Sequence, residues 1–151
     1  MTPLGSKEYS KGAALGDLLM VKFRLPMLPR SGQLPWNAEV YGEEASLHID
    51  GTAILLAVVR DQVGSLGTKR GCDMGTCGCC SVLIDGEPRL SCLTLAQEAS
   101  GCSITTVEGL SDGHHLHPIQ LTFAECGGSP CGFRTPGFLV GISALLAETS
   151  I

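Results

Sequence analysis

The feature that most constrains this chain is a run of cysteines in residues 71–92, GCDMGTCGCCSVLIDGEPRLSC. This stretch holds five of the eight cysteines in the 151-residue sequence. Four of them follow the spacing C-x4-C-x2-C, with eleven residues before the last one: Cys72, Cys77, Cys80 and Cys92. Thiols gathered in this way are typical of a segment that wraps around a metal. The fold is therefore expected to form around this segment.

The spacing is that of plant-type ferredoxins, in which four thiolates hold a 2Fe–2S cluster. Each iron binds two thiolates and two bridging sulfides, so a loop that supplies three thiolates has to curl around the cluster. Glycines permit the positive φ angles that such curling needs, and their N–H groups can point at the sulfurs. The glycines expected to do so are Gly71, Gly75 and Gly78. Lys69 and Arg70 are expected to offset some negative charge. The alternative is a structural zinc site, but zinc favours paired C-x2-C elements with a longer spacer.

Other candidate site residues carry weaker signals. Cys79 neighbours Cys80 and should point elsewhere, either as a spare buried thiol or as an alternative ligand. The run GHHLHP (113–118) could hold a metal, but a surface or helix-capping role is favoured. Three acidic residues at turns are expected to be solvated: Asp85, Glu108 and Asp112. No catalytic residue is predicted, because no arrangement for nucleophilic, phosphate or paired-carboxylate chemistry stands out.

Charge and composition exclude several classes of protein. The net charge of −5 and the isoelectric point of about 5.2 argue against a nucleic-acid surface, which needs clustered Lys and Arg. The first twenty residues lack a basic start followed by a clean apolar run, so no signal peptide is predicted. No segment reaches the length of a membrane span. Clustered cysteines in such a chain favour metal binding in a reducing cytoplasm.

The hydrophobic pattern predicts an α+β protein. Residues 1–35, rich in proline and glycine, are expected to form an arm that packs on a partner or stays mobile. Residues 37–50 have the alternation of a hairpin with its turn at Gly42, and residues 50–64 are expected to form one helix capped by Asp50 or Thr52 and ended by Gly64. A second hairpin turns at Asp85-Gly86. Later segments predict a helical turn, a strand and two helices that begin near prolines.

Two stretches resemble the iron–sulfur subunit of the xanthine oxidase family of molybdenum hydroxylases. They are GTKRGCDMGTCGCCSVLIDGEPRLSCLTLA (67–96) and LHPIQLTFAECGGSPCGFRTPGF (116–138), and the match covers about residues 36–146. The resemblance implies a β-grasp ferredoxin-like domain over 36–110, followed by a short helical domain over 111–151. It also implies that the four spaced cysteines ligate a 2Fe–2S cluster. Molybdopterin and FAD are then expected in partner subunits, the first in a large subunit.

The second half departs from the family pattern, which reads QCGFCTPG and continues about thirty residues later with C-x-C. Here Pro130 stands in place of the glutamine, Cys131 matches the first ligand and Arg134 replaces the second. Cys126 could substitute for one ligand, but the chain reaches Ile151 before any C-x-C. One cluster is therefore expected, in a helical domain truncated relative to the family. Arg134 is expected to fill the vacated position through hydrogen bonds or an ion pair.

The resemblance implies an electron-transfer subunit of a multi-subunit molybdenum hydroxylase or dehydrogenase. Without a second cluster, two alternatives stay open. The chain could be a structural subunit with a redox-idle cluster in a hydratase-like or transhydroxylase-like enzyme, or a free 2Fe–2S ferredoxin. The apolar helices of residues 117–151 disfavour the free ferredoxin, since they are expected to dock on the large subunit.

Overall fold

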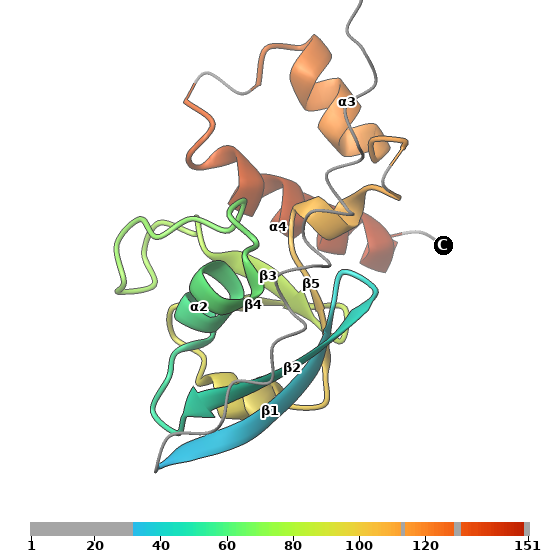
Figure 1. Ribbon diagram of the computed structural model, residues 1–151. Helices are drawn as coiled ribbons and strands as arrows, with labels where there is room; N and C mark the ends of the chain where they lie inside the picture. Colours follow the sequence, from blue (N-terminus) through green and yellow to red (C-terminus); the bar gives the residue numbers. More distant parts are fainter. Residues whose placement is uncertain (1–31, 113, 129–130, 150–151) are drawn as a thin grey trace, which may run out of the picture.

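The computed structural model describes residues 32–112, 114–128 and 131–149. Its centre is a five-stranded sheet with the strand order β2-β1-β5-β3-β4 (Figure 1). The expected arm lies outside the described residues up to position 31, and the first strand already begins at Gln33. The strands are β1 (Gln33–Val40), β2 (Glu43–Asp50), β3 (Ser81–Ile84), β4 (Glu87–Leu90) and β5 (Ser103–Thr105).

Both hairpins turn at a dipeptide in which both φ angles are positive. Tyr41 and Gly42 have φ values of 42° and 85° between β1 and β2, and Asp85 and Gly86 have 51° and 85° between β3 and β4. Turns of this kind have a twist that matches the twist of antiparallel strands. The predicted turns at Gly42 and at Asp85-Gly86 are confirmed.

Strand β5 joins the two hairpins into one sheet. It pairs in parallel with β1 and antiparallel with β3, so it lies between segments that are far apart in the sequence. Trp36 in β1 is fully buried. Its indole N–H donates to the carbonyl of Ala96 at 2.6 Å. Ala96 belongs to the short 3-10 helix η2 (Ala96–Ala99), which corresponds to the predicted helical turn.

The helix predicted over residues 50–64 is shorter and wider than expected. It consists of α2 (Leu55–Ala57), which continues as the π-helical segment η1 (Val58–Val63). Gly64 ends it in a left-handed conformation with φ of 91°, as predicted.

The cap of this helix is not the predicted one. Asp50 accepts hydrogen bonds from the backbone N–H of Thr52 at 2.8 Å and from its hydroxyl at 2.6 Å, which stabilises a turn before the helix. Ile54, the residue before α2, is extended and forms an isolated β-bridge with Leu95. This tertiary pairing competes with helix formation, so the helix begins only at Leu55.

The carboxylate of Glu108, at the start of η3 (Glu108–Leu110), is a hydrogen-bonding centre and not a solvated turn residue. It accepts from the hydroxyls of Ser65 at 2.8 Å and Thr106 at 2.6 Å, and from the N–H of Gly67 at 2.6 Å. Burial by itself raises the pKa of the Glu108 carboxyl, but these hydrogen bonds outweigh it and hold the pKa below its usual value. Glu108 therefore ties the start of the cysteine loop to the segment after β5.

Two helices complete the chain, α3 (Pro118–Glu125) and α4 (Thr135–Thr149). The side chain of His117 accepts from the N–H of Ile119 at 3.3 Å, and the N–H of His117 donates to the side chain of Gln120 at 2.9 Å. This reciprocal arrangement is a capping box. The capping role predicted for the histidine run is confirmed at His117, while His114 and His115 are exposed.

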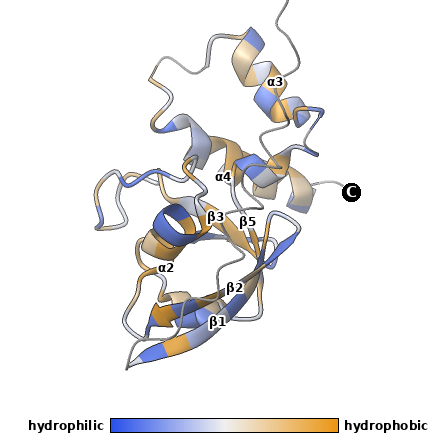
Figure 2. Cartoon of the chain, in the orientation of Figure 1, coloured by the Kyte–Doolittle hydropathy of each residue, from blue (hydrophilic) through white to orange (hydrophobic). Residues whose placement is uncertain are grey.

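Helix α4 lies against the sheet and contacts β3 and β4 as well as α3. Figure 2 shows apolar residues along β3 and in α4 where the two meet. Leu139, Val140 and Ala144 are buried, whereas Phe138 and Leu145 remain exposed. Part of the apolar surface of α4 is therefore covered within the chain. No helix in the described ranges is long and apolar enough to cross a membrane.

Candidate metal centre

The four spaced cysteines lie in two segments that the sheet brings together. Three are in the loop between η1 and β3, and Cys92 follows the end of β4. The N–H and the hydroxyl of Ser91 both donate to the carbonyl of Cys80, at 3.2 and 2.7 Å. The N–H of Leu56 donates to the carbonyl of Ser91 at 3.0 Å. Cys80, Cys92 and Leu56 form one buried cluster, which fixes the second segment against the loop.

The four thiols are arranged as two pairs. Cys72 and Cys77 lie within hydrogen-bonding contact of each other, and so do Cys80 and Cys92. Among the described residues, no three His, Cys, Asp or Glu side chains gather closely enough to hold a metal ion. The contacts of Cys72 with Cys77 and of Cys80 with Cys92 suit a two-iron cluster, in which each iron takes two thiolates. A structural zinc ion would instead need all four ligands around one centre.

Glycines keep the loop close to the sulfurs. A Cβ on Gly71 would lie 2.6 Å from the sulfur of Cys77, so no larger residue fits there without displacing that thiol. Gly75 and Gly78 adopt φ values of 75° and 71°, which side chains disfavour. The three glycines predicted for the site therefore line the loop as expected, although their contact with a cofactor is an expectation.

Backbone N–H groups lie toward two of the sulfurs, whereas the sequence assigns this role to Gly71, Gly75 and Gly78. Cys72 receives a hydrogen bond from the N–H of Met74, and Cys92 receives one from the N–H of Gly75. Such donors stabilise the anionic sulfurs of a bound cluster. The loop and the segment after β4 thus offer four thiols, and N–H donors lie toward two of them.

The pKa values of the Cys72 and Cys92 thiols are shifted in opposite directions. The hydroxyl of Thr76 donates to Cys72 and, with the N–H of Met74 and contacts from Cys77, lowers the pKa of the Cys72 thiol to about 6. Burial, together with the neighbouring Cys80 thiol, raises the pKa of Cys92 to about 11. The Cys72 thiol therefore ionises more readily than the Cys92 thiol, which needs a cation such as iron beside it to be stable as a thiolate.

Comparison with known proteins identifies the family. Residues 35–121 match a family model described as "2Fe-2S iron-sulfur cluster binding domain", and residues 106–150 match one described as "2Fe-2S binding domain". The 6-hydroxypseudooxynicotine dehydrogenase complex subunit beta of Paenarthrobacter nicotinovorans is 38% identical over 115 residues, which cover 76% of this chain and 72% of that protein. This chain belongs to the iron–sulfur subunits of the xanthine oxidase family.

Two further comparisons agree with this family assignment. The crystal structure of quinoline 2-oxidoreductase from Pseudomonas putida 86 matches with a TM-score of 0.76 at 43% identity, covering 79% of this chain and 74% of that one. The aldehyde oxidoreductase iron–sulfur-binding subunit PaoA of Escherichia coli is 40% identical over 115 residues, or 76% of this chain. The chain spans half or less of the length of the first curated relatives that it matches. The predicted α+β, ferredoxin-like fold is confirmed.

Cys79 in this iron–sulfur subunit is the buried fifth thiol that the sequence predicts. It is 2% exposed, and its sulfur contacts the side chain of Cys77. Burial and that contact raise the pKa of the Cys79 thiol.

Among the cations expected to offset charge, Arg70 forms an ion pair with Asp73 at 3.2 Å, so its charge is already compensated. The ammonium of Lys69 donates to the carbonyl of Leu66 at 2.7 Å.

The start of α4 packs directly on the cysteine loop, which sequence reasoning missed. A Cβ on Gly137 would overlap the carbonyl oxygen of Gly78 and lie 2.9 Å from its carbonyl carbon and 3.1 Å from the Cα of Cys79. Gly137 is buried, and only glycine allows this approach. The sequence TPG gives no sign of it, because the contact depends on tertiary placement.

The second site, which the sequence predicts to be degenerate, differs from expectation in one respect. Cys126 and Cys131 are exposed, and hydrogen bonds from the N–H groups of Arg134 and Phe133 lower the pKa of the Cys131 thiol. Arg134 is exposed and lies with its guanidinium carbon 5.7 Å from the centre of the Phe138 ring. No ion pair of Arg134 occurs in the ranges the structure describes. Arg134 therefore stacks on an aromatic ring and does not fill the vacated position by an ion pair.

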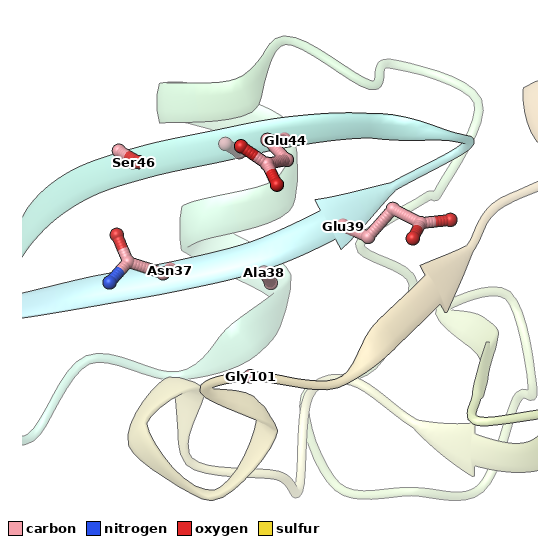
Figure 3. Close-up of a pocket in the computed structure, with 7 residues that line it drawn as sticks. Asn37, Ala38, Glu39, Glu44, Ser46 and Gly101 are labelled. Atoms are coloured by element: carbon pink, nitrogen blue, oxygen red, sulfur yellow. The ribbon is translucent and has the colours of Figure 1, made fainter.

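A separate hollow lies on the β1–β2 hairpin, remote from the cysteine loop in sequence. It has a volume of about 500 Å³ and is lined mainly by polar and acidic side chains. Figure 3 shows Glu39 and Glu44 at this hollow, on neighbouring strands where they are paired in register. Its lining includes no thiol and no cationic side chain, so it carries no part of the candidate metal centre.

Proposed function

We propose that this iron–sulfur subunit carries electrons within a multi-subunit molybdenum hydroxylase or dehydrogenase, by means of one 2Fe–2S cluster. The ligands are the four spaced cysteines: Cys72, Cys77, Cys80 and Cys92. The observation that carries this proposal is that the loop with Cys72, Cys77 and Cys80 is held against the segment with Cys92, because the N–H and the hydroxyl of Ser91 donate to the carbonyl of Cys80. Such a cluster takes up and releases one electron at a time. The chain holds the cluster, orients it and limits its contact with water.

The surface around the loop supports a role inside a complex. Exposed apolar side chains border the cysteines: Met74 is 69% exposed, Leu93 62% and Leu95 42%. Leu93 packs toward Gly75 in the loop itself. An apolar border of this kind is typical of an interface. The partners proposed are a large subunit with molybdopterin and a subunit with FAD, in line with relatives named as subunits of dehydrogenases.

The proposed number of clusters is one. Arg134 stands where the family pattern has the second ligand cysteine, and a second cluster needs four thiolates. Arg134 cannot donate as a thiolate does. The alternative function is a structural subunit whose cluster is redox-idle, and the missing thiols favour it because a lost relay station lengthens the electron path.

For the compartment we propose the cytoplasm, since all eight cysteines are free thiols and a reducing compartment preserves them.

The test is reconstitution of the full chain with iron and sulfide under anaerobic conditions. About two iron and two sulfide ions per chain are expected, with one EPR signal after reduction, as a single 2Fe–2S cluster requires. Four irons per chain, or two distinct EPR signals, would contradict the single cluster.

Serine variants of the four ligand cysteines should lose the visible absorption. Cys131→Ser and Cys79→Ser are the matched controls, since one removes an exposed thiol outside the loop and the other removes the buried neighbour of Cys80. Both controls should keep the spectrum. If Cys79→Ser bleaches the protein and Cys80→Ser does not, the ligand assignment is wrong. Co-purification with molybdopterin- and FAD-containing subunits, and reduction of the cluster by their substrate, distinguish the electron carrier from the redox-idle subunit.

A further inference from the structure

Arg134 lies beside the cysteine loop in three dimensions. A groove of about 330 Å³ runs between the loop and α4, and its wall includes Arg134, Cys77 and Gly78. Cys77 is one of the proposed ligands, so a permanent positive charge shares a cavity wall with a cluster thiolate. The groove is otherwise lined largely by apolar side chains of α4, among them Phe138 and Leu145.

Two contacts determine where the guanidinium lies. The ring of Phe138, one helical turn further on, is 5.7 Å from the guanidinium carbon, a distance at which a cation is attracted to the face of the ring. The close approach of Gly137 to Gly78 and Cys79 fixes the first turn of α4 against the loop. Arg134 is thus held near the sulfurs even though its own side chain is exposed.

The charge of Arg134 is not neutralised by a carboxylate in the described part of the chain, where Arg70 with Asp73 is the single ion pair. Its field reaches the Cys131 thiol, because it contributes to the lowered pKa of that thiol. The N-terminal end of α4, which also packs against Gly78, has a partial positive charge and acts in the same direction.

We propose that Arg134 sets the reduction potential of the cluster held by the cysteine loop, by placing a fixed positive charge across the groove from Cys77. This inference rests on the proposed 2Fe–2S cluster. When the cluster takes up one electron from a donor, the loop gains one negative charge and no bond is made or broken. A nearby cation stabilises the reduced form more than the oxidised form, so it raises the midpoint potential. Arg134 is therefore a positioning residue for charge and not a ligand.

The test is a potentiometric titration of the cluster-loaded full chain, followed by EPR. R134Q should lower the midpoint potential, R134E should lower it further, and R134K should leave it near the wild-type value. The shift between wild type and R134Q should decrease as ionic strength rises, because the side chain is exposed to solvent. A purely structural role of Arg134 would give no such dependence on salt.

R89Q is the matched control, since it removes the same charge from a hollow that no proposed ligand lines. Its shift should be smaller than that of R134Q. An R134Q midpoint equal to that of the wild type, or an R134K shift as large as that of R134Q, would overturn the inference while leaving the cluster in place. A wild-type chain with no visible or EPR signal would refute the proposed cluster itself, and the inference with it.

Discussion

Substituting Gly137 with alanine should destabilise the protein, although alanine is the better helix former. A methyl group at this position meets backbone atoms of Gly78 and Cys79, which cannot rotate away as a side chain could. To bring the carbonyl carbon of Gly78 from 2.9 Å to an ordinary contact of 3.4 Å, helix and loop have to separate by about half an ångström, and the overlapped oxygen needs more.

The expected size follows from two opposing effects. Overpacking of this kind costs about 1–3 kcal/mol. Replacing glycine by alanine in a helix contributes about 0.5–1 kcal/mol in the other direction. Gly137→Ala should therefore lower the free energy of unfolding by about 1 kcal/mol, within a range of about 0–2.5 kcal/mol. Gly141, one turn later in the same helix, has open space within 4 Å of the point where a methyl group would lie, so Gly141→Ala should raise the free energy of unfolding by about 0.5–1 kcal/mol.

The assay is equilibrium urea unfolding of the two variants and the wild type, followed by far-ultraviolet circular dichroism. The visible spectrum of the cluster-loaded protein reports on the loop, and only Gly137→Ala should perturb it. Opposite changes in stability from the same substitution in one helix cannot come from helix propensity alone. If both variants gain stability by similar amounts, α4 does not pack on the loop as described.

Further predictions concern the hydrogen bonds that surround the loop. Glu108→Gln should lower the free energy of unfolding at pH 7 by about 1–3 kcal/mol, because it weakens three hydrogen bonds to a charged acceptor. The pKa of Glu108 is depressed in the folded state, so its contribution is present above the unfolded pKa and is lost as the pH falls through the folded one. Acid titration of stability should therefore be flatter in Glu108→Gln than in the wild type; identical profiles would contradict the depressed pKa. His117→Ala should cost about 1 kcal/mol through loss of the capping box and should speed amide hydrogen exchange at Ile119; unchanged exchange there would contradict the cap.

Local chemistry made much of this fold predictable. The dipeptide Asp85-Gly86 favours positive φ angles, and so does Gly42, so both turns follow from local preferences. The cap at His117 depends on residues three positions apart. The helix over 50–64 failed as a prediction because Ile54 pairs with Leu95, a contact across forty residues that no local pattern contains.

The candidate site divides in the same way. The spacing of the cysteines predicts three thiols and three glycines in one loop with Cys92 on the next hairpin, and the contacts of Cys72 with Cys77 and of Cys80 with Cys92 agree with it. The contact of Gly137 with Gly78 and the place of Arg134 beside Cys77 depend on how α4 meets the loop. Nothing in the residues near Arg134 indicates that approach.

The position of β5 bears on how the chain folds as it is synthesised. β5 is the last of the five strands to leave the ribosome, yet it lies in the middle of the sheet (Figure 1). A nascent chain that ends before Ser103 already contains all four proposed ligands and both hairpins, each of which closes through local contacts. It lacks the one strand that joins those hairpins, so no continuous sheet can form. The four proposed ligands are therefore synthesised before the strand that completes the sheet.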